Sequence, residues 1–311
     1  MSLEVANISK NGVLTQELNA EVFNSYINYL DVTPKTIETY TKALRQLFTF
    51  LQDRNIKQPT RDDIIAFREN LKETGHKPST IQNYIIAVRL FFRWTAQAGI
   101  YPNVADHLKG AKLNREHKKD YLAPKQIKQV LAGIDTTTLQ GIRDYAIVAL
   151  MVTGGLRTIE VSRANIEDLR TLGNETVLYV QGKGREEKAE YIKIMPEVEQ
   201  AIRDYLKTRT ATPDAPLFTS ISNNSANKRM TTRSISGIAK KYMVKAGYNS
   251  PRLTAHSLRH SAVTISLMAG ESLEEVQKFA RHQNIATTMI YNHALDMAKN
   301  NCSKTIAKAI F

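Results

Sequence analysis

The sequence has almost no cysteine. Cys302 is the only one among 311 residues, so the chain can form no internal disulfide and no cysteine-based zinc site. Such a composition is typical of a reducing compartment. The chain also lacks a basic, apolar leader at its start and any run of roughly 18 apolar residues that could span a membrane. We therefore expect a cytoplasmic protein in which Cys302 has no special role.

Motifs for nucleotide and metal chemistry are missing as well. The sequence contains no Gly-x-x-x-x-Gly-Lys-Ser/Thr loop that would bind phosphate and no acidic cluster that would hold magnesium. It also has no internal repeat and no low-complexity tract. These absences agree with a protein that needs no metal, ATP or other cofactor.

Positive charge is what the chain has in excess. Its 43 Lys and Arg residues against 30 Asp and Glu give a net charge of +13. A positive field of this size attracts polyanions such as DNA. The excess is uneven, because residues 1–113 carry 14 basic and 11 acidic side chains whereas residues 114–311 carry 29 and 19. Solubility alone is the competing explanation.

Helical periodicity dominates the first third of the chain. Apolar residues recur at helical spacing in four segments, whose starts are marked by Leu18, Pro34, Thr60 and Pro78. Proline at the first helical position and an acceptor oxygen just before a helix are common start signals. We predict a small helical bundle over residues 19–113, preceded by a lead-in at residues 1–18 with little function of its own.

A run without apolar side chains separates this bundle from a second domain. Residues 114–120 are predicted to be a linker, which would let two basic domains close around duplex DNA or would simply be a solvated loop. Residues 121–311 show helical periods, including a buried segment at Leu139–Thr153. Between residues 167 and 194 the period changes to two on either side of Gly182-Lys183-Gly184-Arg185. The second domain is therefore predicted to be mainly α with a small antiparallel β-sheet.

Several polar residues of the second domain suit phosphate chemistry. Arg157 follows the glycine pair 154–155, which allows close backbone approach, although an Arg157–Glu160 pair could be purely structural. His256 and Arg259 are three positions apart and share a helix face, where a guanidinium matches phosphate oxygens and an imidazole exchanges protons. A capped helix start would look the same. Taken singly, Tyr291 is more often a packed aromatic than a nucleophile.

The order and spacing of these residues resemble the tyrosine recombinase family, also called the phage integrase family, which includes the Xer proteins. The resemblance covers roughly residues 19–311. Gly155-Leu156-Arg157-Thr158-Ile159-Glu160 matches the family's Gly-Leu-Arg-x-x-Glu, Lys183 matches the lysine of its Gly-Lys-Gly hairpin, and His256 and Arg259 match its His-x-x-Arg. His282 matches the histidine of Leu-Gly-His, and Tyr291 the tyrosine of Thr-x-x-x-Tyr-x-His. Five matches in order are highly specific.

The sequence departs from the family pattern at two places. Ala280-Arg281 precede the histidine where the family usually has Leu-Gly, which introduces bulk and charge beside His282. The glycine at 154–155 is doubled where the family usually shows one. Neither departure removes a catalytic side chain.

The resemblance implies a SAM-like core-binding domain and a catalytic domain that together clamp duplex DNA, without an arm-binding domain. It implies that Arg157 and Arg259 hold the scissile phosphate, that Lys183 protonates the departing 5′ hydroxyl, and that Tyr291 becomes joined to the DNA 3′ end. His256 would assist proton transfer at the tyrosine, and His282 would donate a hydrogen bond to the phosphate. Four protomers on two specific DNA sites would exchange strands through a four-way junction, with residues 298–311 docking into a neighbour or, alternatively, packing on their own domain.

Direct DNA contacts are harder to predict. Outward basic and polar positions of the bundle are candidates, although a solvated face would look identical: Lys42, Arg45, Lys77, Gln82 and Arg89. Two other functions compete. A type IB topoisomerase uses a similar residue set to relax supercoils without site preference, and a DNA-binding protein that has lost catalysis would serve as a repressor or architectural factor. The complete set of catalytic residues argues against the second.

Overall fold

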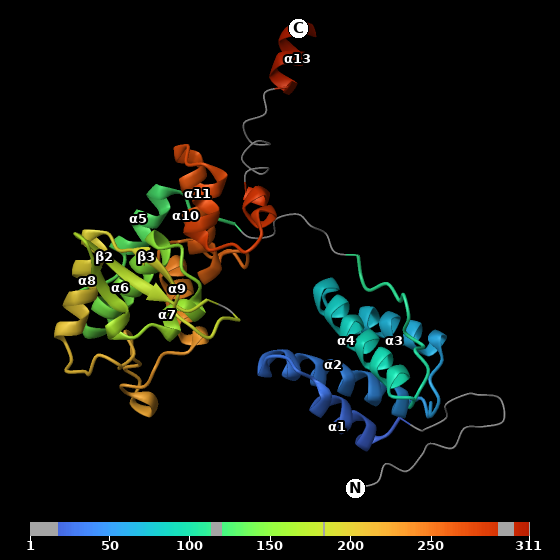
Figure 1. Ribbon diagram of the computed structural model, residues 1–311. Helices are drawn as coiled ribbons and strands as arrows, with labels where there is room; N and C mark the ends of the chain where they lie inside the picture. The colour runs from blue at the N-terminus through green and yellow to red at the C-terminus, as the bar shows by residue number, and fades with distance from the viewer. Residues whose placement is uncertain (1–17, 113–119, 183, 292–301, 311) are drawn as a thin grey trace. The chain divides into compact units, whose positions relative to one another are not determined.

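The computed structural model describes residues 18–112, 120–182, 184–291 and 302–310 (Figure 1). The chain divides into two compact units, Met1–Arg115 and Glu116–Phe311. The predicted lead-in lies outside the described residues except for Leu18, and so does the predicted linker except for Asp120. Among the described residues, no helix is both long enough and apolar enough to cross a membrane.

The first unit is a bundle of four helices, as predicted. They are α1 (Ala20–Tyr29), α2 (Pro34–Asp53), α3 (Arg61–Glu73) and α4 (Pro78–Gln97). Their starts follow the local signals of the sequence. Pro34 and Pro78 occupy first-turn positions of α2 and α4, where the missing N–H costs nothing, and Thr60 and Asp63 form a capping box at α3.

The apolar stripes of these helices form the core of the bundle. On α4 every member of the predicted stripe is buried: Ile81, Tyr84, Ile85, Val88, Phe91, Phe92 and Thr95. The ring of Tyr26 on α1 lies edge-on to Phe91 with 5.3 Å between centroids, a favourable aromatic geometry. Figure 1 shows α2, α3 and α4 of this unit side by side, and α4 contacts both α2 and α3.

The second unit combines helices with one small sheet. Its helices are α5 (Pro124–Ala132), α6 (Leu139–Thr153), α7 (Thr158–Arg163), α8 (Pro196–Lys207), α9 (Thr232–Lys245), α10 (Ala255–Ala269), α11 (Leu273–Ala280) and α13 (Cys302–Ile310), with 3₁₀ turns at Ile166–Asp168 and Asn223–Ser225. Residues 285–291 are also helical. The strands are β1 (Leu169–Leu172), β2 (Glu175–Val180) and β3 (Glu190–Lys193).

The sheet is antiparallel in the order β1-β2-β3, with Leu178 opposite Ile192 and Tyr179 opposite Tyr191. The sequence predicted β2 and β3, and the structure adds β1, because its residues Leu169–Leu172 do not alternate between apolar and polar. The loop between β2 and β3 contains Lys183, which lies outside the described residues.

Helix α6 forms the centre of the second unit. All residues from Ala146 to Val152 are buried, as predicted, whereas Leu139 at the start of the predicted buried segment is 47% exposed. The helix contacts α8 and α10. A helix that is apolar all round must be covered on every side, so the ends of α6 and α10 have fixed positions relative to one another.

Gly141 in α6 and Gly237 in α9 provide a matched test of this packing. A Cβ atom at residue 141 would lie 1.7 Å from the carbonyl oxygen of Asp135, whereas at residue 237 nothing lies within 4 Å. We expect Gly141→Ala to lower the free energy of unfolding by about 1–3 kcal/mol, as overpacking does. Gly237→Ala should raise it by about 0.5–1 kcal/mol. Urea unfolding followed by circular dichroism measures both, and equal effects would contradict the packing.

Candidate active site

The turn between α6 and α7 brings backbone into the middle of the site. Gly154 caps α6, and Gly155 adopts a φ of 55°, a left-handed conformation that favours glycine. A Cβ atom at residue 154 would lie 2.4 Å from Ile192 on β3, and one at residue 155 would lie 2.9 Å from Phe279 on α11. Both glycines are therefore needed for the close approach that the sequence predicted.

Arg157 follows this turn and pairs with Glu160. Its guanidinium donates a 2.7 Å hydrogen bond to one carboxylate oxygen, and its backbone N–H donates a 2.9 Å bond to the other. The side chain of Glu160 is fully buried, whereas that of Arg157 is 29% exposed. Burial alone would raise the pKa of Glu160, but the charge of Arg281 and the hydrogen bonds from Arg157 hold it below its usual value. Arg157 thus pairs with a buried carboxylate and still reaches solvent.

Arg259 and His256 lie on α10, one helical turn apart. Arg259 is only 1% exposed, and its guanidinium donates hydrogen bonds to the carbonyl oxygens of Gly155, at 2.7 Å, and of Ala280. Burial and the nearby charges of Arg157 and Arg281 lower its pKa, yet a guanidinium stays protonated at neutral pH. His256 is exposed.

His282 lies in the turn that follows α11. Its Nδ1 lies 2.9 Å from the hydroxyl oxygen of Thr288, and both side chains are buried. Burial, and then the positive charges of Arg259 and Arg157, lower the pKa of His282 to about 4. The imidazole is therefore neutral at physiological pH.

Tyr291 lies in the helical stretch 285–291 and is 7% exposed. Its ring packs in a small apolar cluster made by Val263, Leu267, Val276 and Ala280. The ring centroid lies 4.9 Å from that of His260 and 6.3 Å from that of His282. Burial raises the pKa of the phenol to about 12, although Arg259 and Arg157 act in the opposite direction. The tyrosine is thus buried next to His282 of its own chain.

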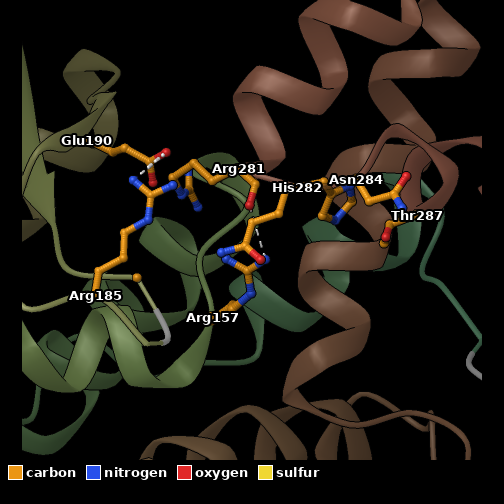
Figure 2. Close-up of a pocket in the computed structure, with 9 residues that line it drawn as sticks. Arg157, Arg185, Glu190, Arg281, His282, Asn284 and Thr287 are labelled. Carbon is orange, nitrogen blue, oxygen red and sulfur yellow. Dashed lines mark hydrogen bonds and ion pairs between the residues drawn. The ribbon is translucent and has the colours of Figure 1, made fainter.

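A cavity of about 300 Å³ opens between these elements. Its lining is rich in cations and amides: Arg157, Gly182, Arg185, Glu190, Arg281, His282, Gln283, Asn284 and Thr287. Figure 2 shows Arg157 directed at the carbonyl oxygen of Arg281, and Arg185 paired with Glu190 at 3.1 Å. Gly182 is the neighbour of Lys183, whose own placement lies outside the described residues. The structure thus brings Arg157, Arg259, His282 and Tyr291 together, with His256 on the exposed surface of α10.

The sequence did not point to three of the residues found here. His260 is 4% exposed, and its ring lies 4.6 Å from that of His256 and 4.9 Å from that of Tyr291. The spacing of four residues between His256 and His260 on one helix was the available signal. Thr288 carried no signal of its own, and Arg281 was visible only as a departure from the family motif.

The predicted DNA-contacting residues lie on the first unit. Lys42, Arg45 and Lys77 are exposed, whereas Gln82 and Arg89 are partly buried. Gln82 packs against the backbone of Gly110, where a Cβ atom would lie 1.9 Å from its Oε1. Their role in DNA contact stays a prediction. Among the described residues, no group of three or more His, Cys, Asp or Glu side chains is arranged to hold a metal ion.

A cationic pocket beside a buried phenol suits an enzyme that holds a phosphodiester next to a tyrosine nucleophile. Comparison with known families agrees. The phage integrase family model matches residues 120–297, and the model of the phage integrase N-terminal SAM-like domain matches residues 23–99. The chain belongs to the phage integrase family, that of the tyrosine recombinases.

Curated relatives and solved structures are consistent with this assignment. A tyrosine recombinase of Synechococcus elongatus is 25% identical over 89% of this chain and 90% of its own length. The tyrosine recombinase XerC of Herpetosiphon aurantiacus is 28% identical over 86% and 89%. The XerH recombinase in a post-cleavage complex with its difH DNA shares the fold, with a TM-score of 0.71 at 19% identity over 88% of this chain and 80% of its own. A lambda integrase dimer on a core site has a TM-score of 0.67 at 15% identity, over 88% and 97%.

The depressed pKa of His282 predicts a specific pH dependence. We expect its imidazole to titrate near pH 4 in the folded protein and near 6.5 in the urea-unfolded chain. Between these values the unfolded chain binds a proton that the folded site excludes, so stability from this group is lost as the pH falls from 6.5 to 4. An NMR titration, with the His282→Gln spectrum to assign the signal, measures both values. A folded-state midpoint near 6.5 would contradict the environment described.

Proposed function

We propose that this protein is a site-specific DNA recombinase that breaks and rejoins strands through a covalent bond between Tyr291 and the DNA 3′ phosphate. The observation that carries the proposal is the position of the Tyr291 ring, which lies beside that of His282, and His282 lines an arginine-rich pocket. Segments distant in the sequence supply this pocket, and a structural tyrosine would not need two guanidinium groups nearby.

In this proposal the two arginines bind the scissile phosphate. Arg259 is oriented by two carbonyl oxygens, so part of its donor fork is fixed before DNA arrives. Arg157 is held by Glu160 but remains 29% exposed at the cavity. Preorganised guanidinium groups of this kind stabilise negative charge on a pentacoordinate phosphorus better than they stabilise the ground state.

The environment of Tyr291 determines which protons must move during the reaction. With a pKa of about 12, the phenol must lose its proton during attack. We assign His256 to assist that transfer, and the ring of His260 is in contact with the rings of both His256 and Tyr291. If the hydroxyl of Thr288 donates to Nδ1 of His282, the proton of His282 resides on Nε2. The Nε2–H group can then donate to a phosphate oxygen.

The proposed reaction exchanges one phosphate ester for another. The Tyr291 oxygen gives up its proton with the help of His256 and forms a bond to phosphorus, the bond to the 5′ oxygen breaks, and Lys183 gives a proton to that oxygen, which leaves as a 5′ hydroxyl. A 5′ hydroxyl from a second duplex then reverses these steps and releases the tyrosine. Because the number of ester bonds is unchanged, no high-energy cofactor is needed.

Double-stranded DNA with specific recombination sites is the proposed partner, and the net charge of +13 supports it. We further propose a homotetramer on DNA, joined through the C-terminal segment. On α13, Ile306 and Ile310 are 57% and 67% exposed, and apolar side chains at this exposure favour docking into a neighbour.

The cytoplasmic location expected from the sequence stays a prediction.

A nicked suicide duplex tests the function directly, with a recognition site selected by binding from a randomised DNA pool. The intact chain should form a covalent protein–DNA adduct that Tyr291→Phe cannot form. Arg157→Ala should form it about 10²–10³-fold more slowly, because one transition-state donor is lost, while binding DNA within a few-fold of the intact chain. Denaturing gel electrophoresis measures the adduct.

Tyr145→Phe is the matched control, since Tyr145 lines a different cavity with Glu197 and Asp204. It should cleave like the intact chain. An adduct with Tyr291→Phe would refute the assignment of the nucleophile. Relaxation of supercoils without site preference, and without exchange between two sites, would instead identify a type IB topoisomerase.

The role of Lys183 as a general acid has its own test. Lys183→Ala should slow cleavage of ordinary DNA at least 100-fold, within the range for general acid catalysis. A substrate with sulfur in place of the 5′ oxygen should restore most of the rate, because a thiol has a pKa near 8.5 and its thiolate leaves without a proton. Arg157→Ala should gain no such rescue. If sulfur rescues neither variant or both equally, Lys183 is not the acid.

A further inference from the structure

Arg281 occupies a position at which the backbone favours glycine. It caps α11 with φ 52° and ψ 46°, in the left-handed region. A side chain is disfavoured in this conformation unless other contacts compensate. The side chain of Arg281 is nonetheless only 4% exposed. The hydrogen bonds of its guanidinium should therefore show why an arginine is buried at this turn.

The guanidinium of Arg281 ties three segments together. It donates hydrogen bonds to the carbonyl oxygen of Phe279 at 2.7 Å, to that of Gly155 at 3.1 Å, and to the carboxylate of Glu160 at 3.0 Å. These partners belong to α11, to the turn after α6, and to α7. Its own carbonyl oxygen accepts a 3.3 Å hydrogen bond from Arg157. Arg281 thus contacts Arg157 through its main chain and contacts Glu160, the partner of Arg157, through its side chain.

The neighbours of Arg281 complete the arrangement. The carbonyl oxygen of Ala280 accepts a hydrogen bond from Arg259, and the next residue is His282, whose ring lies beside Tyr291. Three consecutive residues, 280–282, therefore hold one phosphate-binding arginine, brace the other, and place the histidine. A shift of this turn would move all of them at once.

The charge of Arg281 has a separate effect on Arg157. Glu160 is fully buried and shared between Arg157 and Arg281. Without Arg281, the whole negative charge of the carboxylate would fall to Arg157, which would then be held more tightly to protein and less available to a phosphate. Oε2 of Glu160 would keep only the hydrogen bond from the backbone N–H of Arg157, and the loss of its charged partner would also loosen the turn.

We propose that Arg281 is a positioning residue that sets the geometry of Arg157, Arg259 and His282 before DNA binds. Both arginines line the cavity, but the side chain of Arg281 is 4% exposed and bonded to three segments of the protein, whereas that of Arg157 is 29% exposed. The expected effect of Arg281 on the rate of DNA cleavage rests on the proposed function. Its effect on the pKa of His282 can be measured without DNA.

Three variants test the role. Arg281→Gly suits the left-handed backbone and removes the guanidinium, and Arg281→Lys keeps the charge but cannot span all three partners. Arg143→Gln is the matched control, because Arg143 also is a buried arginine, paired with Asp144 at 2.6 Å in α6. At saturating suicide DNA, we expect Arg281→Gly to form the adduct at least tenfold more slowly, with DNA affinity within threefold of the intact chain. Arg281→Lys should be intermediate, and Arg143→Gln should stay within threefold in both measurements.

A second readout separates positioning from general stability. His282 faces the charges of Arg259, Arg157, His256 and Arg281 as well as the ring of Tyr291. Loss of one positive charge should raise the pKa of His282 in Arg281→Gly, whereas Arg281→Lys and Arg143→Gln should leave it close to that of the intact chain. NMR of the DNA-free protein measures this.

Two results would overturn the inference. If Arg281→Gly cleaves as fast as the intact chain, Arg281 positions nothing. If its DNA affinity falls as much as its cleavage rate, Arg281 is a DNA ligand and not a positioning residue. A failure of the proposed function is distinguishable from both, because the intact chain would then form no adduct at all, while the titration of His282 would still respond to the charge at residue 281.

Discussion

The carboxylate of Glu160 is fully buried and must be neutralised, and Arg157 and Arg281 neutralise it from two segments that are 124 positions apart. An unpaired buried charge is so costly that this ion cluster constrains everything attached to it. The first turn of α7, the end of α6 and the end of α11 are therefore held together. The same cluster supplies guanidinium groups to a cavity, so one set of contacts neutralises the buried carboxylate and places the cations that the proposed function needs.

The glycine pair at 154–155 makes this cluster sterically possible. With no side chains there, β3 and α11 approach the turn closely, and the Gly155 carbonyl oxygen accepts hydrogen bonds from both Arg259 and Arg281. The backbone thus acts as the acceptor that orients two guanidinium groups. The doubled glycine, which departs from the usual family pattern, has in this chain a specific steric reason at each position.

Much of the fold could be predicted from the sequence, because the signals involved are local. Proline and capping residues marked the helix starts, and the apolar stripe of α4 is buried in full. Strand β1 was missed because its exposed residues lack alternation, and α7 because its six residues are too few for a periodic signal. The motif residues of the site were recognised by order, whereas the links from Arg281 to Glu160 and from His260 to Tyr291 span chain distances that no periodicity reports.

The burial of Tyr291 has a consequence for when the chain can react. Its ring lies among apolar side chains and imidazoles, and the phenol is protonated at any physiological pH. A small phosphate ester that diffuses into the cavity brings no binding energy to expose the ring or strip its proton. Under the proposed function, a long duplex would bring such energy through its many contacts. The free protein would then not react with the other phosphodiesters of the cell, and strand breakage would require a fully bound substrate.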